Sequence, residues 1–323
     1  MMAFDRQLRL MDMSIYVLFR GCLQVIANNA NAKISRANIP EVEHHLNGIQ
    51  KIVQLRGGIE KLPMIRQFRT KVALVDMLVA ALNNSKPRFP PFFEVQPRIP
   101  LPHMQGIDGN LILESPLYGN KPLDQVFRGS PFGEHGVQIL QRMRDMTNVV
   151  LDHTGMAFYE ASGTPVPDYN IIRVGPASKS MISSTNTFRG SSTEEENEQS
   201  LLPQSPLTPL IHAANIYTAV LSPLLAPSCL PAPLKPFSTH RNLQSLKALV
   251  QALQIPANDS IFVHYPGLMI WILLVAAVAA EGRDERGFLV MFLIRVGSGS
   301  VHGYWEEMRE SIERFRRIRE LVG

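Results

Sequence analysis

The sequence predicts an all-α fold: a multi-helix globular domain that carries a disordered insert rich in Ser, Thr and Glu. In several segments of the 323 residues, apolar side chains recur at spacings of three and four, as on the buried face of a helix. No convincing run of five or more residues alternates between apolar and polar side chains, as a half-buried strand would. The uncharged run from Leu268 to Ala280 is apolar all round, which places it in the centre of a core.

The helices follow from these patterns in chain order. The last is the clearest, because one apolar face collects residues three and four apart: Trp305, Met308, Ile312, Phe315 and Arg319. The segment 288–296 is a buried helix or a strand, and we expect Gly297-Ser298-Gly299-Ser300 to end it as a flexible connector. The expected helices cover residues 41–56, 68–82, 137–160, 207–222, 243–253 and 268–280, together with a last helix from 305.

The chain divides into an N-terminal helical segment (1–40), a first helical part (41–174), an insert (175–209) and a second helical part (210–323) packing on the first. Twelve of the 35 residues of the insert are Ser or Thr, and Glu194-Glu195-Glu196 adds negative charge. Such a segment buries too little apolar surface to offset its ordering entropy, so we predict disorder. A phosphorylated or acidic interaction segment is the alternative interpretation.

Composition excludes several classes of protein. The net charge of +4 is a small excess and does not favour a nucleic-acid-binding surface. Cys22 and Cys229 are the two cysteines, too few for a disulfide framework or a structural zinc site. The longest uncharged apolar run has thirteen residues, whereas a membrane helix needs about 20, so we expect no membrane partner.

We find no pattern typical of catalysis. His44 and His45 are adjacent and point about 100° apart on a helix, so they cannot bind one metal as residues one turn apart do. Asp152, His153 and His264 are isolated candidates. The sequence therefore predicts no enzyme, no cofactor and no metal.

Two stretches of the first part and two of the second carry a further pattern. A helix containing His45 and Gly48 ends at Arg56-Gly57-Gly58, and a second helix with Asp76 precedes Pro87-Arg88-Phe89-Pro90. In the second part, Trp271 begins an apolar helix that runs into Ala279-Ala280-Glu281-Gly282, and Trp305 opens the last helix. Nine positions carry the motif: His45, Gly48, Arg56, Gly57, Gly58, Pro87, Phe89, Trp271 and Trp305.

This pattern resembles the fungal-specific transcription factor domain, the helical regulatory region found behind the binuclear zinc-cluster module of many fungal regulators. The resemblance covers most of residues 41–321 and implies architectural roles, with no catalytic residues. Gly48 costs about 1 kcal/mol in mid-helix relative to Ala, so we expect a neighbouring helix to approach it closely. Arg56 in the last turn suits the negative end of the helix dipole.

The zinc module of that family requires six cysteines, and Cys22 is the one cysteine before residue 228. The resemblance therefore implies a transcription regulator-like protein without its own DNA-binding module. It would be a truncated product, a mis-assigned start, or a factor acting through partners in transcription regulation. We expect the partners to be the transcriptional machinery or a DNA-binding protein, with no direct sequence-specific DNA binding. The effector molecule is unknown, and the expected location is the nucleus, with the cytoplasm as alternative.

Two other functions stay open. A helical adaptor unrelated to transcription would show the same periodicity and the same lack of reactive motifs. An enzyme with an unrecognised site would need convergent polar groups in a pocket, around Asp152, His153 or His264.

Overall fold

The computed structural model describes residues 39–61, 66–89, 111–119, 121–152, 205–225, 237, 242–255, 263–300 and 304–322. Within these ranges all regular secondary structure is helical, apart from an isolated bridge between Ser115 and Tyr118, which confirms the all-α prediction. Most of the N-terminal segment 1–40 and residues 175–204 of the predicted insert lie outside the described residues.

The elements lie in chain order as follows: α2 (Ile39–Leu55), the short 3-10 helix η1 (Ile59–Lys61), α3 (Arg66–Leu82), α4 (Leu123–Val126), α5 (Gly133–Leu151), α7 (Leu207–Leu225), α8 (Leu243–Leu253), α10 (Pro266–Ala279), α11 (Glu285–Ser300) and α12 (Trp305–Val322). No helix in the described ranges is both long enough and apolar enough to cross a bilayer.

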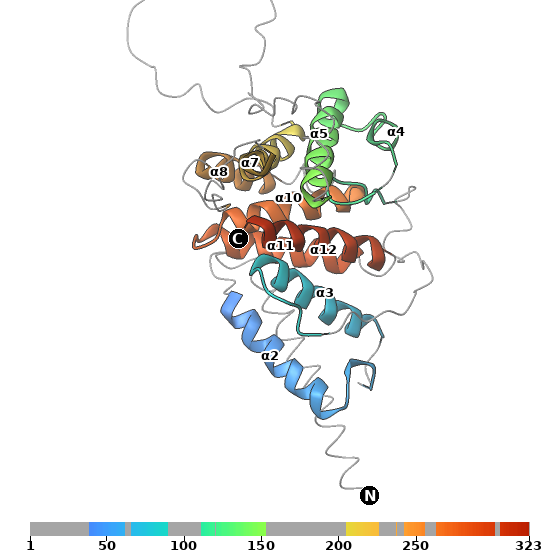
Figure 1. The fold of residues 1–323 in the computed structure, drawn as a ribbon, viewed down its shortest axis with the longest axis vertical. Helices are drawn as coiled ribbons and strands as arrows, with labels where there is room; N and C mark the ends of the chain where they lie inside the picture. Colours follow the sequence, from blue (N-terminus) through green and yellow to red (C-terminus); the bar gives the residue numbers. More distant parts are fainter. Residues whose placement is uncertain are drawn as a thin grey trace, which may run out of the picture.

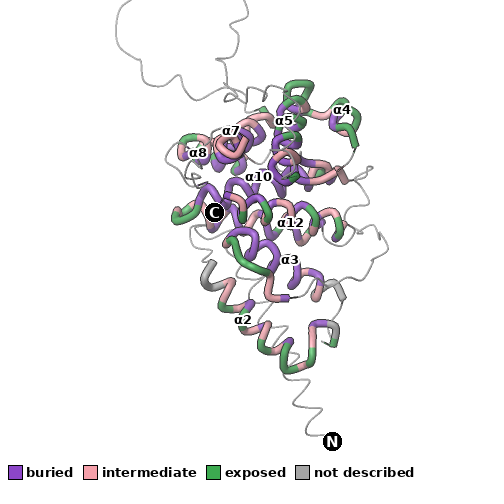
Figure 2. The backbone as a smooth tube through the Cα atoms, viewed as in Figure 1, coloured by how far each residue is buried: buried purple, intermediate pink, exposed green. Residues whose placement is uncertain are grey.

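Helix α10 is the centre of the molecule. Its sequence, PGLMIWILLVAAVA, is apolar throughout, and all 14 residues are buried (Figure 2). Pro266 occupies the start of the helix, where its missing N–H breaks no helical hydrogen bond. Because α10 has no polar face, helices must surround it, and α3, α7, α8, α11 and α12 all pack against it.

The other helices are arranged around α10 in an order that mixes the two predicted parts of the chain. In Figure 1, α2 lies outermost beside α3, α3 lies against α11 and α12, and α7, α8 and α5 cover the opposite side of α10. α5 packs on α7 and α3 packs on α12, so helices from before and after the insert share one hydrophobic core.

Helix α11 corrects the expectation for residues 288–300. The segment is a helix, and it continues through Gly297-Ser298-Gly299-Ser300 instead of ending there in a flexible connector. Gly297 is buried, and a Cβ at this position would lie 3.2 Å from Leu74 Cδ2 of α3. The glycine therefore serves a close approach between α11 and α3.

Two other helices have different boundaries from those expected. α7 begins at Leu207, the start expected for this helix, and ends at Leu225, beyond the expected end at 222. Its first three residues fall within the segment 175–209 that we predicted to be disordered, and Pro209 among them is buried. α5 begins at Gly133, before the expected start at 137, and residues 153–160 of that expected helix lie outside the described residues.

The close glycine contact expected at Gly48 is wrong. A Cβ at Gly48 would meet no atom within 4 Å, so no neighbouring helix requires a glycine there. Among the glycines in the described ranges, Gly267 at the start of α10 has the least room, because a Cβ there would lie 1.9 Å from the carbonyl oxygen of Leu113. The Gly267 N–H also donates to the carbonyl oxygen of Ile112, at 3.3 Å, so the segment 111–113 is held against α10 by its backbone.

The two glycines make a matched pair for mutagenesis. We expect Gly267→Ala to lower the free energy of unfolding by about 1–3 kcal/mol or more, because the added methyl group overlaps a backbone carbonyl. We expect Gly48→Ala to raise the free energy of unfolding by about 0.5–1 kcal/mol, because alanine reduces the conformational freedom of the unfolded chain and meets no atom in the folded helix. Urea unfolding of both variants measures the difference, and equal losses at the two positions would contradict the assignment.

Candidate functional site

The end of α2 is built by the two glycines of the motif. The N–H of Gly58 donates to the carbonyl of Val53 at 3.0 Å, and the N–H of Gly57 donates to that of Gln54 at 3.1 Å. These are the two bonds of a Schellman cap, with Arg56 as the C-cap residue. Gly57 has φ +78° and Gly58 has φ +128°, values that residues with a side chain rarely adopt. The glycine pair therefore fixes where α2 ends and how the chain leaves it.

Asp76 holds the Pro87-Arg88-Phe89 segment on α3. Its carboxylate is 1% exposed and accepts the backbone N–H of Arg88 at 2.6 Å and that of Phe89 at 2.9 Å. The Arg88 guanidinium adds a third hydrogen bond through Nη1, at 3.2 Å. The Phe89 ring is buried in the core as a result, so a single carboxylate fixes both the backbone and the ring of this segment.

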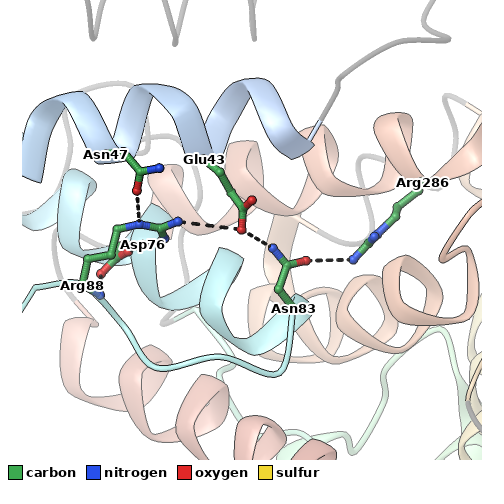
Figure 3. A network of polar contacts seen from close by, with 6 residues as sticks. All are labelled: Glu43, Asn47, Asp76, Asn83, Arg88 and Arg286. Carbon is green, nitrogen blue, oxygen red and sulfur yellow. Dashed lines mark hydrogen bonds and ion pairs between the residues drawn. The ribbon is translucent and has the colours of Figure 1, made fainter.

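Arg88 then joins this segment to α2 (Figure 3). Its Nε donates to Asn47 Oδ1 at 2.9 Å, and its Nη2 lies 3.7 Å from Glu43 Oε1. Asn47 and Glu43 are four residues apart and therefore share one face of α2. The same Glu43 oxygen accepts a hydrogen bond from Asn83 Nδ2 at 2.7 Å, so α2 is also tied to the end of α3.

Arg286 of α11 completes the connection. Its Nη2 donates to Asn83 Oδ1 at 3.1 Å (Figure 3). The same Nη2 donates to the carbonyl oxygen of Leu82 at 3.2 Å, and this is the second bond. The second bond satisfies a carbonyl at the end of α3 that has no partner within the helix. We call the whole set the polar network, and it comprises Glu43, Asn47, Asp76, Asn83, Arg88 and Arg286.

Burial sets the electrostatics of the network. It raises the pKa of Asp76 above the usual value, although the hydrogen bonds from Phe89 and Arg88 oppose this shift. It lowers the pKa of Arg286, while the nearby carboxylates of Glu281 and Glu43 act in the opposite direction. The network positions α2, α3 and α11 relative to one another, and its side chains bond to one another and to backbone groups.

The remaining motif residues lie apart from this arrangement. His45 is half-buried on α2, edge-on to the exposed ring of His44 with ring centroids 6.2 Å apart. Trp271 does not begin its helix, because α10 starts five residues earlier, and its buried ring packs edge-on against Tyr217 at 5.5 Å. Trp305 is the first residue of α12 and is buried. Both tryptophans are core residues.

The catalytic candidates do not come together in the described residues. Asp152 and His264 are exposed, and His153, Cys22 and Cys229 lie outside the described ranges. Within those ranges, no three side chains of His, Cys, Asp or Glu are grouped so that they could hold a metal.

Sequence reasoning missed several polar residues that form hydrogen bonds between elements. Arg144 on α5 donates to three backbone carbonyls, those of Ser115 at 3.2 Å, Lys121 at 2.8 Å and Tyr118 at 2.9 Å, and so fixes the loop before α4. Glu43 and Asn47 had a sequence signal in their spacing of four residues. Arg286 had none, because its partner Asn83 is 203 residues away.

Comparison of the chain with protein-family models, with curated proteins and with solved structures finds no match.

Asp76 tests the network directly. We expect Asp76→Asn to lower the free energy of unfolding by about 1–3 kcal/mol, because the amide group presents an N–H₂ to backbone N–H donors that it cannot satisfy. Asp145→Asn is the matched control, since Asp145 is exposed on α5 and accepts one hydrogen bond from Gln141 at 2.8 Å. We expect the control to change stability by less than about 0.5 kcal/mol in urea unfolding.

The raised pKa of Asp76 determines the direction in which the free energy of unfolding changes with pH. A folded-state pKa above the unfolded value means that the stability from Asp76 is fully present below the unfolded pKa. That stability is lost as the pH rises through the folded pKa. The difference in unfolding free energy between the wild type and Asp76→Asn should therefore be greater at about pH 4 than at about pH 7. Urea unfolding at both values measures it, and a difference that grows toward neutral pH would contradict the expected sign.

Proposed function

We propose that this chain is the helical regulatory or effector domain of a transcription regulator of the fungal-specific transcription factor type, acting in the nucleus through other proteins. The proposal is supported by the hydrogen bonds that join the motif segments of α2 and α3 into one structural unit. The helix that ends at Gly57-Gly58 is joined through Asn47 to Arg88, and Asp76 holds Arg88 and Phe89. The segments that carry the resemblance therefore depend on one another physically.

The position of α2 supports a regulatory role. The helix lies at the edge of the molecule, with much of its surface half-buried or exposed (Figure 2). Its polar face is held by Arg88 and Asn83, whereas α10 is held by apolar packing on every side. α2 also buries Leu46, Ile49 and Val53 on one face, but an outer helix with a single buried face can be shifted by a partner at lower cost than a core helix.

The partners that we propose are proteins of the transcriptional machinery or a separate DNA-binding protein. The zinc module implied by the resemblance needs six cysteines, and these 323 residues contain two. Contact with DNA would therefore be made by a partner protein. Exposed Leu55 at the end of α2 adds an apolar side chain to the face that such a partner could use.

A tethering experiment tests this function. The full chain is fused to an unrelated DNA-binding module in fungal cells, and transcription of a reporter with the matching site is measured. We expect a several-fold change relative to the module alone. Arg88→Ala should reduce the effect, because it releases α2 from the Pro87-Arg88-Phe89 segment, whereas Arg142→Ala on the exposed face of α5 should not.

The controls separate the candidate functions. Immunoblotting and microscopy must show that each fusion is present in the nucleus, so that a null effect is informative. An unchanged reporter with a folded, nuclear fusion would refute the transcriptional role. A tagged chain that is excluded from the nucleus and co-purifies with cytosolic scaffold proteins would favour the adaptor instead.

A further inference from the structure

A buried arginine occupies an apolar position of α12. Arg319 continues the face that carries Ile312 and Phe315, and its side chain is 7% exposed. Its Cζ lies 5.6 Å from the centre of the Phe237 ring. No hydrogen bond from its guanidinium to any described residue is present, and the buried Nε has no partner. A buried N–H donor without a hydrogen-bond partner is costly, and the Nε–H of Arg319 is one.

One carboxylate stands between this arginine and Arg286. Glu281 lies in the turn after α10, with Oε2 at 3.9 Å from Nη2 of Arg319 and Oε1 at 3.9 Å from Nη1 of Arg286. Charge-assisted N–H···O bonds have lengths of about 2.7–2.9 Å, so Glu281 approaches both guanidinium groups and bonds to neither. Its side chain is 47% exposed, so this position opens to solvent.

Glu281 is the carboxylate that the two guanidinium groups share, and Glu43 also acts on Arg286. Burial lowers the pKa of Arg319, Glu281 raises it, and the positive charge of Arg286 lowers it further. Arg144 shows the contrast, because its buried guanidinium donates to three carbonyl groups. Arg319 therefore lacks the carbonyl partners that satisfy Arg144.

We infer that Arg286 and Arg319 form a binding site for a small organic carboxylate, with Glu281 as a built-in competitor. The two oxygens of Glu281 already face one guanidinium each, which is the arrangement that a bridging carboxylate requires. A free carboxylate is not tethered to the turn and can approach both groups to about 2.8 Å. It would enter on the exposed side, where Glu281 would swing outward into solvent.

This inference goes beyond the proposed function and does not depend on it. The site is a property of α11, α12 and the turn between α10 and α11, and it would bind its ligand in a regulator, an adaptor or an enzyme alike. Arg286 also belongs to the polar network, so an occupied site would contact the end of α3 through Asn83.

Calorimetric titration of the full chain tests the site. The probes are malonate and inorganic phosphate, each compared with sodium chloride at equal ionic strength. We expect saturable malonate binding to the wild type and about tenfold tighter binding to Glu281→Gln, which removes the competing charge. Arg319→Met should abolish binding and still fold, because methionine suits the apolar face of α12.

Glu306→Gln is the matched control, since Glu306 is also a half-exposed acid and pairs with Arg309 at 2.9 Å, and we expect it to leave the affinity unchanged. Equal binding by the wild type and Arg319→Met would mean an adventitious ion only and would overturn the site. Absence of malonate binding even in Glu281→Gln would also overturn it. Tighter binding of phosphate than of malonate, lost in Arg319→Met, would overturn the carboxylate assignment. Because binding is measured without transcription, its failure is distinct from failure of the proposed function.

Discussion

The complete burial of α10 is the constraint on which the rest of the structure depends. Every one of its 14 residues is buried, so no side of the helix can face water and each neighbouring helix must present an apolar face to it. Full burial of one large apolar side chain contributes about 1.5–3 kcal/mol, and α10 contains several, among them Trp271 and Ile272. The backbone of Leu113 packs directly on Gly267, which shows how closely the surrounding chain approaches α10. The other helices take their positions from this one.

In an apolar core each buried charged group loses its hydration and needs other partners, and these partners differ from one position to the next. Asp76 accepts three hydrogen bonds, Arg144 donates to three carbonyl groups, and Arg286 caps the end of α3. Hydrogen bonds within the protein replace the hydrogen bonds to water that these groups lose on burial. Arg319 does not, because an aromatic ring and a carboxylate at 3.9 Å are its described neighbours. That difference separates Arg319 from Asp76 and Arg144.

The sequence predicted those parts of the fold that depend on spacing along the chain. The helix after Asn242 and the helix from Trp305 were predicted with nearly their observed limits, because residues three and four apart define a buried face without reference to other segments. The helix ending at Ser300 was ambiguous, because its apolar residues have no period. Gly48 was expected to be crowded and is not, whereas Gly297 was expected in a connector and is crowded, because only the neighbour across space decides which glycine is crowded. The network was beyond prediction for the same reason.

Arg286 connects the polar network with the proposed carboxylate site through a single guanidinium. Its Nη1 faces Glu281, and its Nη2 donates to Asn83 and to the last carbonyl of α3. The guanidinium is planar and rigid, so a movement that brings Nη1 toward a bound anion also moves Nη2. Asn83 in turn donates to Glu43, which is a contact of α2 with the body of the protein. A ligand bound at Arg286 and Arg319 would therefore change the contacts that hold α2 on the body of the protein. In the proposed regulatory role, a protein partner changes the same contacts.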